Sequence, residues 1–214
     1  MIDGVPNFHR EIGHDVSDKY YAKPIKHSFY FFPWNEDELN IFSEVRKVWG
    51  VYKLIGGLDF NEYAQNLPRD GIVDRIQVVN YPLGGGKIDV HFDPYHGMKP
   101  VLSTYLSKRG EDYHSGGFYL IGQNEQVIDV EDQIDVGDMS FTFPTVAHGV
   151  APVDEDQPLD FKNSNGRWWL GMFSVDSDMV KDRKTGGDIS LATKKYPETN
   201  LLVGGVATVE PKDI

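Results

Sequence analysis

The chain has 214 residues, enough for one domain with a substantial core, so we expect residues 1–214 to form a single domain. Its formal net charge of -12 argues against a broad phosphate-binding surface, and nucleic acid is therefore not expected as a partner. The chain contains no cysteine, which excludes disulfides, thiolate nucleophiles and zinc–thiolate sites, so any metal must be held by His, Asp or Glu.

Residues 1–27 mix charged residues, histidine, Gly and Pro without a clear period, which predicts an irregular arm. The beginning of this arm is too polar for a signal peptide. No apolar run in the chain approaches the roughly 20 residues that a membrane-spanning helix needs. We therefore expect a cytoplasmic protein without a membrane partner, and the sequence leaves its oligomeric state open.

Residues 35–67 are expected to form helical support for the domain. A helix is predicted over residues 35–49, with Asn35 at the N-cap and acidic residues in the first turn. Its apolar face would consist of Leu39, Phe42, Val45, Val48 and Trp49. A second, shorter helical segment is predicted over residues 59–67, ending before Pro68.

The pattern becomes that of short strands from Ile72 onward, because β-branched and alternating segments recur between Gly, Asp and Asn turns. A first strand is expected earlier, at 28–32. Further strands are predicted at 72–80, 88–92, 101–107, 117–122, 126–130, 139–143 and 168–175. This series predicts a mainly β sandwich or jelly roll over about 72–178, with the N-terminal helices packed outside. Residues 179–214 form a C-terminal extension, in which 201–209 is a last strand or a packed tail.

A candidate metal site lies in the strand that ends in His91 and Asp93. Successive strand residues point to opposite sides, so these two side chains share a face. With one more imidazole they would complete the two-histidine, one-carboxylate set that binds Fe(II) on one side and leaves the other side open. His148 is the candidate third ligand. The alternative is that His91 is a hydrogen-bonded strand histidine and Asp93 a turn acid before Pro94.

Arg167 opens the last predicted strand of the core, where it shares a face with Trp169, Gly171 and Phe173. A guanidinium that points into this mostly apolar interior needs an anion. No acid lies two or four residues further along the strand, so the partner is either a distant protein carboxylate or a bound dicarboxylate. The alternative is a surface arginine at a strand start.

Four motifs follow one another along residues 81–178. They are Tyr81-Pro82 with glycines leading to His91-x-Asp93, the strand 101–107 followed by Ser115-Gly116-Gly117-Phe118, the run from Gly137-Asp138 through Phe143-Pro144 to 148–153, and the strand that begins at Arg167. In this order they resemble the prolyl 4-hydroxylase-like branch of the Fe(II)/2-oxoglutarate-dependent oxygenases. The chain departs from that pattern at Ser107, where Asn is usual, and by an insertion at 154–165.

The resemblance implies a double-stranded β-helix, which is a jelly roll, with His91, Asp93 and His148 as iron ligands. It further implies that Arg167 pairs with the far carboxylate of 2-oxoglutarate and that Tyr105 donates a hydrogen bond to the same carboxylate. Tyr81 would line the pocket. The implied cofactors are Fe(II), 2-oxoglutarate as cosubstrate and O2.

The activity implied by the resemblance is hydroxylation of an aliphatic C–H bond, with release of succinate and CO2. The substrate would be a small-molecule or peptidyl compound that contains proline or is otherwise amino-acid-like. A cupin-like metal- or small-molecule-binding protein on the same jelly roll is the main alternative, since residues 137–148 also resemble a cupin motif. An isomerase or a sugar binder is a third. His96 and His114 are expected in loops without a chemical role.

The acids of the insertion, Asp154, Glu155 and Asp156, are expected in a solvated loop. Beside the mouth of the site they would instead favour a cationic substrate.

Overall fold

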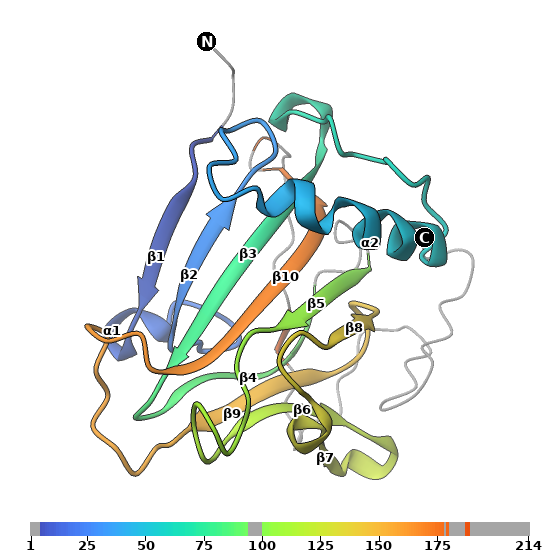
Figure 1. Cartoon of the computed structure of the whole chain (residues 1–214). Coiled ribbons are helices and arrows are strands. Elements are labelled where there is room, and N and C mark those ends of the chain that lie inside the picture. The colour runs from blue at the N-terminus through green and yellow to red at the C-terminus, as the bar shows by residue number, and fades with distance from the viewer. Residues whose placement is uncertain (1–4, 94–99, 178, 180–186, 189–214) are drawn as a thin grey trace.

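Two antiparallel sheets face each other in the computed structural model, which describes residues 5–93, 100–177, 179 and 187–188 (Figure 1). The larger sheet has the order β1 (Phe8–Ile12), β2 (Lys26–Phe31), β3 (Ile72–Pro82), β10 (Gly166–Asp176), β5 (Val101–Tyr105) and β8 (Met139–Thr142). The smaller sheet has the order β11 (Gly187–Asp188), β4 (Gly86–Phe92), β9 (His148–Val153), β6 (Gly117–Ile121) and β7 (Val127–Asp129).

The strands from β3 to β10 form a nested set of pairs. β6 pairs with β7, β5 with β8, β4 with β9, and β3 with β10, all antiparallel. Successive pairs alternate between the two sheets: β6–β7 and β4–β9 belong to the smaller sheet, and β5–β8 and β3–β10 belong to the larger sheet. This is the topology of a jelly roll, so the predicted mainly β fold is confirmed.

The two longest strands, β3 and β10, separate two environments. On their inner face, toward the smaller sheet, Val79 and Tyr81 pack with Val150 and Val153. On their outer face, Ile76 and Met172 pack with Trp49 of helix α2 (Ile41–Ile55). Because side chains alternate along a strand, covering both faces buries nearly every residue of these strands.

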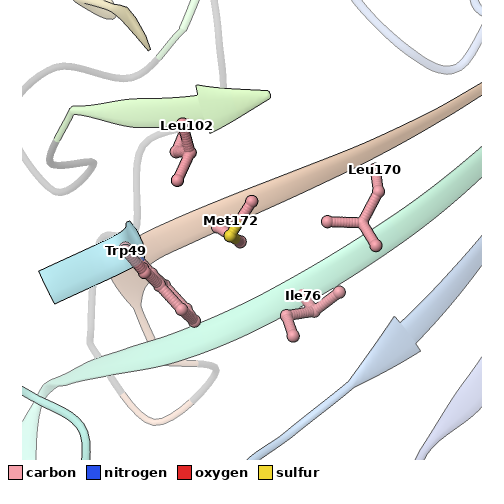
Figure 2. Close-up of a cluster of buried hydrophobic side chains, with 5 residues drawn as sticks. All are labelled: Trp49, Ile76, Leu102, Leu170 and Met172. Carbon is pink, nitrogen blue, oxygen red and sulfur yellow. The ribbon is translucent and has the colours of Figure 1, made fainter. Parts of the chain in front are cut away.

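Helix α2 lies against the outer face of the larger sheet (Figure 1). Figure 2 shows the cluster beneath it, made of Trp49, Ile76, Leu102, Leu170 and Met172. Partly buried residues of the helix complete the contact, namely Ile41, Phe42, Val45, Val48 and Tyr52. The predicted apolar face is therefore confirmed except at Leu39, which precedes the helix and is 69% exposed.

The predicted set of N-terminal helices is wrong, because α2 is the one helix of substantial length among the described residues. It begins at Ile41 instead of residue 35, since the carboxylate of Asp37, not the side chain of Asn35, accepts hydrogen bonds from the first-turn amides of Ile41 and Phe42. Residues 60–65 form turns instead of a helix, followed by the 3₁₀ turn η1 (Pro68–Asp70). Helix α1 (His14–Ser17) has four residues, and no described helix is long and apolar enough to cross a membrane.

Three strands among the described residues went unpredicted: β1, β9 and the two-residue β11. β1 lies within residues 1–27, which were expected to be an irregular arm, and it pairs with β2 along its whole length. β9 carries His148 and fills the gap between the predicted strands at 139–143 and 168–175. The possible last strand at 201–209 lies outside the described residues.

A buried ion pair joins helix α2 to the larger sheet. Lys53 Nζ lies 2.5 Å from Asp74 Oδ2, and the side chains of both residues are at most 5% exposed. Ser174 of β10 donates a second hydrogen bond, 2.7 Å long, to the Asp74 carboxylate. Burial lowers the pKa of Lys53 and raises that of Asp74, and the charge of each partner opposes both shifts. Each charge therefore depends on the other being present.

We expect Lys53→Met to lower the free energy of unfolding by roughly 3 to 5 kcal/mol, because it leaves Asp74 buried without a cation. Urea denaturation followed by circular dichroism measures this. Lys47→Met, on the exposed side of the same helix, is the matched control and should change stability by no more than about 0.5 kcal/mol. Equal effects of the two substitutions would contradict a stabilising role for the pair.

Candidate metal centre

His91, Asp93 and His148 converge where β4 ends and β9 begins. One potential ligand atom from each lies within 4.8 Å of the other two. Asp93 lies between the histidines, since one carboxylate oxygen is 3.8 Å from His91 Nε2 and the other is 3.7 Å from His148 Nε2. Two imidazoles and one carboxylate on one side of a point form the set that binds Fe(II) and leaves positions open for other ligands.

Strand pairing creates this convergence. His91 of β4 lies directly opposite His148 of β9, and their ring centroids are 4.5 Å apart. The pairing shifts register between Ile88 and His91, which marks a bulge. Strict alternation would turn residues three apart to opposite faces, so the bulge allows both Ile88 and His91 to line the same cavity.

Hydrogen bonds fix which nitrogen of each histidine faces the site. His91 Nδ1 lies 2.8 Å from the carbonyl oxygen of Asp89, and His148 Nδ1 lies 2.8 Å from that of Val146. A carbonyl can only accept, so each Nδ1 carries the proton and each Nε2 presents a lone pair to the site. This outer arrangement is typical of metal-binding histidines.

Burial lowers the pKa of His91 to about 4, and the neighbouring His148 lowers it further while Asp93 opposes the shift. The imidazole is therefore neutral at pH 7, which is the form that binds a metal ion.

A cavity of about 170 Å³ lies between the two sheets. The three candidate metal ligands, His91, Asp93 and His148, line its wall. Two of the other predicted site residues line it, Tyr81 of β3 and Arg167 of β10, which are direct partners in the strand pairing. Both are almost completely buried. The expectation that Arg167 points inward beside Trp169 is confirmed, because Trp169 lines the same cavity.

Arg167 has a protein partner. Its Nε donates a 2.8 Å hydrogen bond to Glu131, and each side chain is 2% exposed. Tyr113 and the backbone amide of Phe118 also donate to the Glu131 carboxylate. Arg167 Nη2 is buried and has no hydrogen-bond partner among the described residues. The sequence left two possible anionic partners for Arg167, a distant protein carboxylate or a bound dicarboxylate, and the structure contains the first of these. One guanidinium nitrogen, Nη2, remains available for a further acceptor.

Tyr105 lies beside Arg167, whose guanidinium carbon is 5.7 Å from the centre of the tyrosine ring. Its hydroxyl pairs with Ser140 Oγ at 2.8 Å. Tyr105 is not among the residues that line the cavity of the metal cluster. Its contact with a cosubstrate carboxylate therefore stays a prediction.

The remaining sequence candidates lie elsewhere. The backbone amide of His114 donates to the Asp154 carboxylate, and neither residue lines the metal cavity. Asp154 is 2% exposed, so its predicted solvated position is wrong: it also accepts hydrogen bonds from Ser115 and holds that turn. Glu155 and Asp156 are exposed, as expected. His96 lies outside the described residues.

Three residues at the site were missed by the sequence reasoning, namely Lys26, Arg75 and Glu131. Lys26 and Arg75 line the metal cavity. Burial is the main cause that lowers the pKa of Lys26 to about 8; Asp93 opposes the shift and Arg75 adds to it. A period-two reading of β3 would have placed Arg75 on the face of Tyr81. Nothing in the local sequence distinguishes Glu131 from the acids around it.

No family model matches the chain, and no curated protein matches its sequence. Among solved structures, a prolyl-4-hydroxylase from Pseudomonas putida matches with a TM-score of 0.47 and 12% identity, over 78% of this chain and 77% of that one. A Trichoplax adhaerens prolyl hydroxylase, in complex with a hypoxia inducible factor peptide fragment, matches with a TM-score of 0.46 and 16% identity, over 79% and 70%.

A full-length Neurospora crassa protein, in complex with alpha-KG, matches with a TM-score of 0.42 and 14% identity, over 81% of this chain and 63% of that one. Independently of these matches, the structure brings together the His-x-Asp pair and the distal histidine that the resemblance to prolyl 4-hydroxylases implies.

Asp93→Ala is expected to abolish tight binding of a divalent metal while the fold persists, because the carboxylate lies between the two histidines and is partly open to solvent. Isothermal titration with Mn(II) measures the affinity, and circular dichroism reports the fold. Asp89→Asn, which changes a neighbouring acid outside the cluster, is the control and should bind Mn(II) like the unaltered chain. Unchanged affinity in Asp93→Ala would contradict the ligand assignment.

The stability of the metal-free protein should rise with pH between about 4 and 6.5. Folding lowers the pKa of His91, so in this window the unfolded state binds more protons than the folded state does. This proton binding stabilises the unfolded state, and the stabilisation is lost as the pH increases. The full contribution is on the order of 3 kcal/mol. Urea denaturation in EDTA across this range measures the slope, and His91→Gln should flatten it. Parallel slopes for both proteins would contradict the lowered pKa.

Proposed function

We propose that the chain is an Fe(II)/2-oxoglutarate-dependent dioxygenase that hydroxylates an aliphatic C–H bond. One observation carries the proposal: three metal-ligand side chains, with both histidine Nδ1 atoms anchored on carbonyls, open on a cavity that also contains a buried guanidinium. His91, Asp93 and His148 would hold the iron. When bound, iron and 2-oxoglutarate supply the oxidising chemistry with O2, releasing succinate and CO2 and leaving a hydroxyl on the substrate.

The residues present fit a carboxylate at the far end of the cavity. Arg167 Nη2 is buried there without a hydrogen-bond partner among the described residues, and burying such a donor is costly unless an acceptor reaches it. Tyr81 lies beside Arg167 on the neighbouring strand. Glu131 fixes the orientation of the guanidinium through Nε, which leaves Nη2 to receive the cosubstrate.

Four aromatic side chains belong to the cavity wall, namely Tyr81, Phe118, Trp169 and Phe173. Phe118 lies 5.9 Å from the His148 ring, and Trp169 packs edge-on against Phe173 at 5.8 Å. Apolar walls of this kind would strengthen electrostatic contacts with a bound ligand, since they lower the local dielectric constant.

The second candidate is a cupin-like binding protein on the same jelly roll. It is favoured by the Arg167–Glu131 pair, since a protein carboxylate already compensates much of the charge that a 2-oxoglutarate carboxylate would otherwise neutralise. Anaerobic addition of Fe(II) and 2-oxoglutarate distinguishes the two candidates. An oxygenase develops a weak visible charge-transfer band and forms succinate once O2 is admitted, whereas a binder does neither.

Arg167→Lys is expected to weaken 2-oxoglutarate strongly while iron binding stays nearly unchanged. Lysine keeps the positive charge beside Glu131 but lacks the planar fork that reaches both Glu131 and a second carboxylate. By analogy with broken buried ion pairs, the loss is roughly 3 to 5 kcal/mol. The 2-oxoglutarate dependence of succinate formation and the iron content are the measurements. Unchanged 2-oxoglutarate dependence in Arg167→Lys would overturn the assignment.

A further inference from the structure

A second cavity, of about 500 Å³, adjoins the metal centre. It lies among β1, β2, β3 and residues 19–24, and its size is that of a small-ligand site. Six residues line both cavities: Lys26, Arg75, Gln77, Ile88, His91 and Asp93. A molecule in the second cavity therefore lies against the metal ligands.

Positive charge dominates the wall of this second cavity, here called the cationic cavity. Four cations line it, Arg10, Lys19, Lys26 and Arg75, against two carboxylates, Asp93 and Asp176. Asp93 belongs to the set of candidate metal ligands, and Asp176 is the other acid that lines this wall among the described residues. The chain as a whole has a formal net charge of -12, so an excess of positive charge on this wall is not expected from the composition.

Aromatic rings hold two of these cations. The Arg10 guanidinium carbon is 5.2 Å from the Phe8 ring centre, and that of Arg75 is 5.1 Å from the Tyr30 ring centre. Contact with a ring face stabilises a guanidinium, and Arg75 Nη2 also donates a 3.3 Å hydrogen bond to Gln77. Among the described residues, Arg10, Lys19 and Lys26 form no ion pair with a carboxylate.

Most of the other residues on this wall are apolar or aromatic. Phe8 stacks on Tyr30 with centroids 4.5 Å apart, and Phe32 stacks on Trp34 at 4.7 Å. These rings offer a surface for the apolar body of a ligand. The cationic cavity thus combines an aromatic wall with cations at the end that meets the metal centre.

We propose that the cationic cavity binds the substrate, and that this substrate is a small organic acid whose carboxylate or phosphate lies at Lys26 and Arg75 and whose apolar body packs on the rings. A neutral substrate would leave Lys26 without a paired anion, and a cationic one would be repelled. The inference rests on the proposed function for the statement that the ligand is a substrate, but the binding itself can be tested separately.

The test uses fluorine NMR on the full chain loaded with Zn(II), which is redox-inert. The probes are 4-fluorophenylacetate and 4-fluorophenyl phosphate, each compared with a neutral counterpart, 4-fluorophenylacetamide and 4-fluorobenzyl alcohol. We expect at least one anion to bind about tenfold more tightly than its counterpart, the effect of one charge-assisted hydrogen bond. Absence of such a preference in both pairs would overturn the proposal.

Variants locate the bound anion. Lys26→Met and Arg75→Met should each weaken the anion about tenfold and leave the neutral probe unchanged, whereas Arg75→Lys should retain most of the affinity. Lys108→Met is the matched control, since Lys108 pairs with Asp135 and lines neither cavity. Equal affinity in Lys26→Met, Arg75→Met and Lys108→Met would overturn the proposal.

Two further measurements separate the alternatives. Saturating 2-oxoglutarate should leave the anion bound, and displacement would mean that Lys26 and Arg75 serve the cosubstrate instead. Binding only of N-acetyl-aspartyl-4-fluorophenylalanine amide, and of neither small anion, would assign the cavity to acidic peptides and also overturn the proposal. Succinate formation is measured independently, so its absence would contradict the oxygenase without affecting the binding result.

Discussion

The metal centre depends on the register in which β4 meets β9. His91 and His148 are direct cross-strand partners, and a slip by one residue would turn one of them away from the cavity. Neighbouring strands hold this register, because β6 pairs with the other edge of β9. Gly149 adds a steric constraint: a Cβ there would lie 2.5 Å from the Tyr119 hydroxyl oxygen, so the Tyr119 side chain occupies the space that a larger residue would need.

Charge is distributed differently on the two faces of the larger sheet. On the outer face the Lys53–Asp74 pair is closed and serves the docking of a helix. On the inner face the Arg167–Glu131 pair leaves one guanidinium nitrogen unbonded among the described residues. Both pairs bury charge at a cost that packing must offset, but only the inner pair leaves a donor available to another molecule. The inner face is therefore the one on which the proposed ligand site lies.

Local sequence patterns predicted the strands, the shared face of His91 and Asp93, and the inward position of Arg167, because each follows from alternation within one strand. The partner of Arg167 could not be predicted in this way, since Glu131 reaches it from a 3₁₀ turn 36 residues away. β1 was missed because its middle residues, His9, Arg10 and Glu11, are all exposed, so no apolar alternation marks it. The start of α2 shifted because the carboxylate that accepts its first amides belongs to Asp37.

The nested strand pairing also bears on how the chain can fold. Pairing β3 with β10 directly would close a loop of nearly the whole core, which is entropically costly and slow. If β6 and β7 pair first, each outer pair closes only the short additional segments beside a pair already made. The three metal ligands lie on the third of these four pairs and just beyond it, so they come together late along such a route. A metal ion would then bind a nearly complete barrel and would contribute little to the early steps of folding.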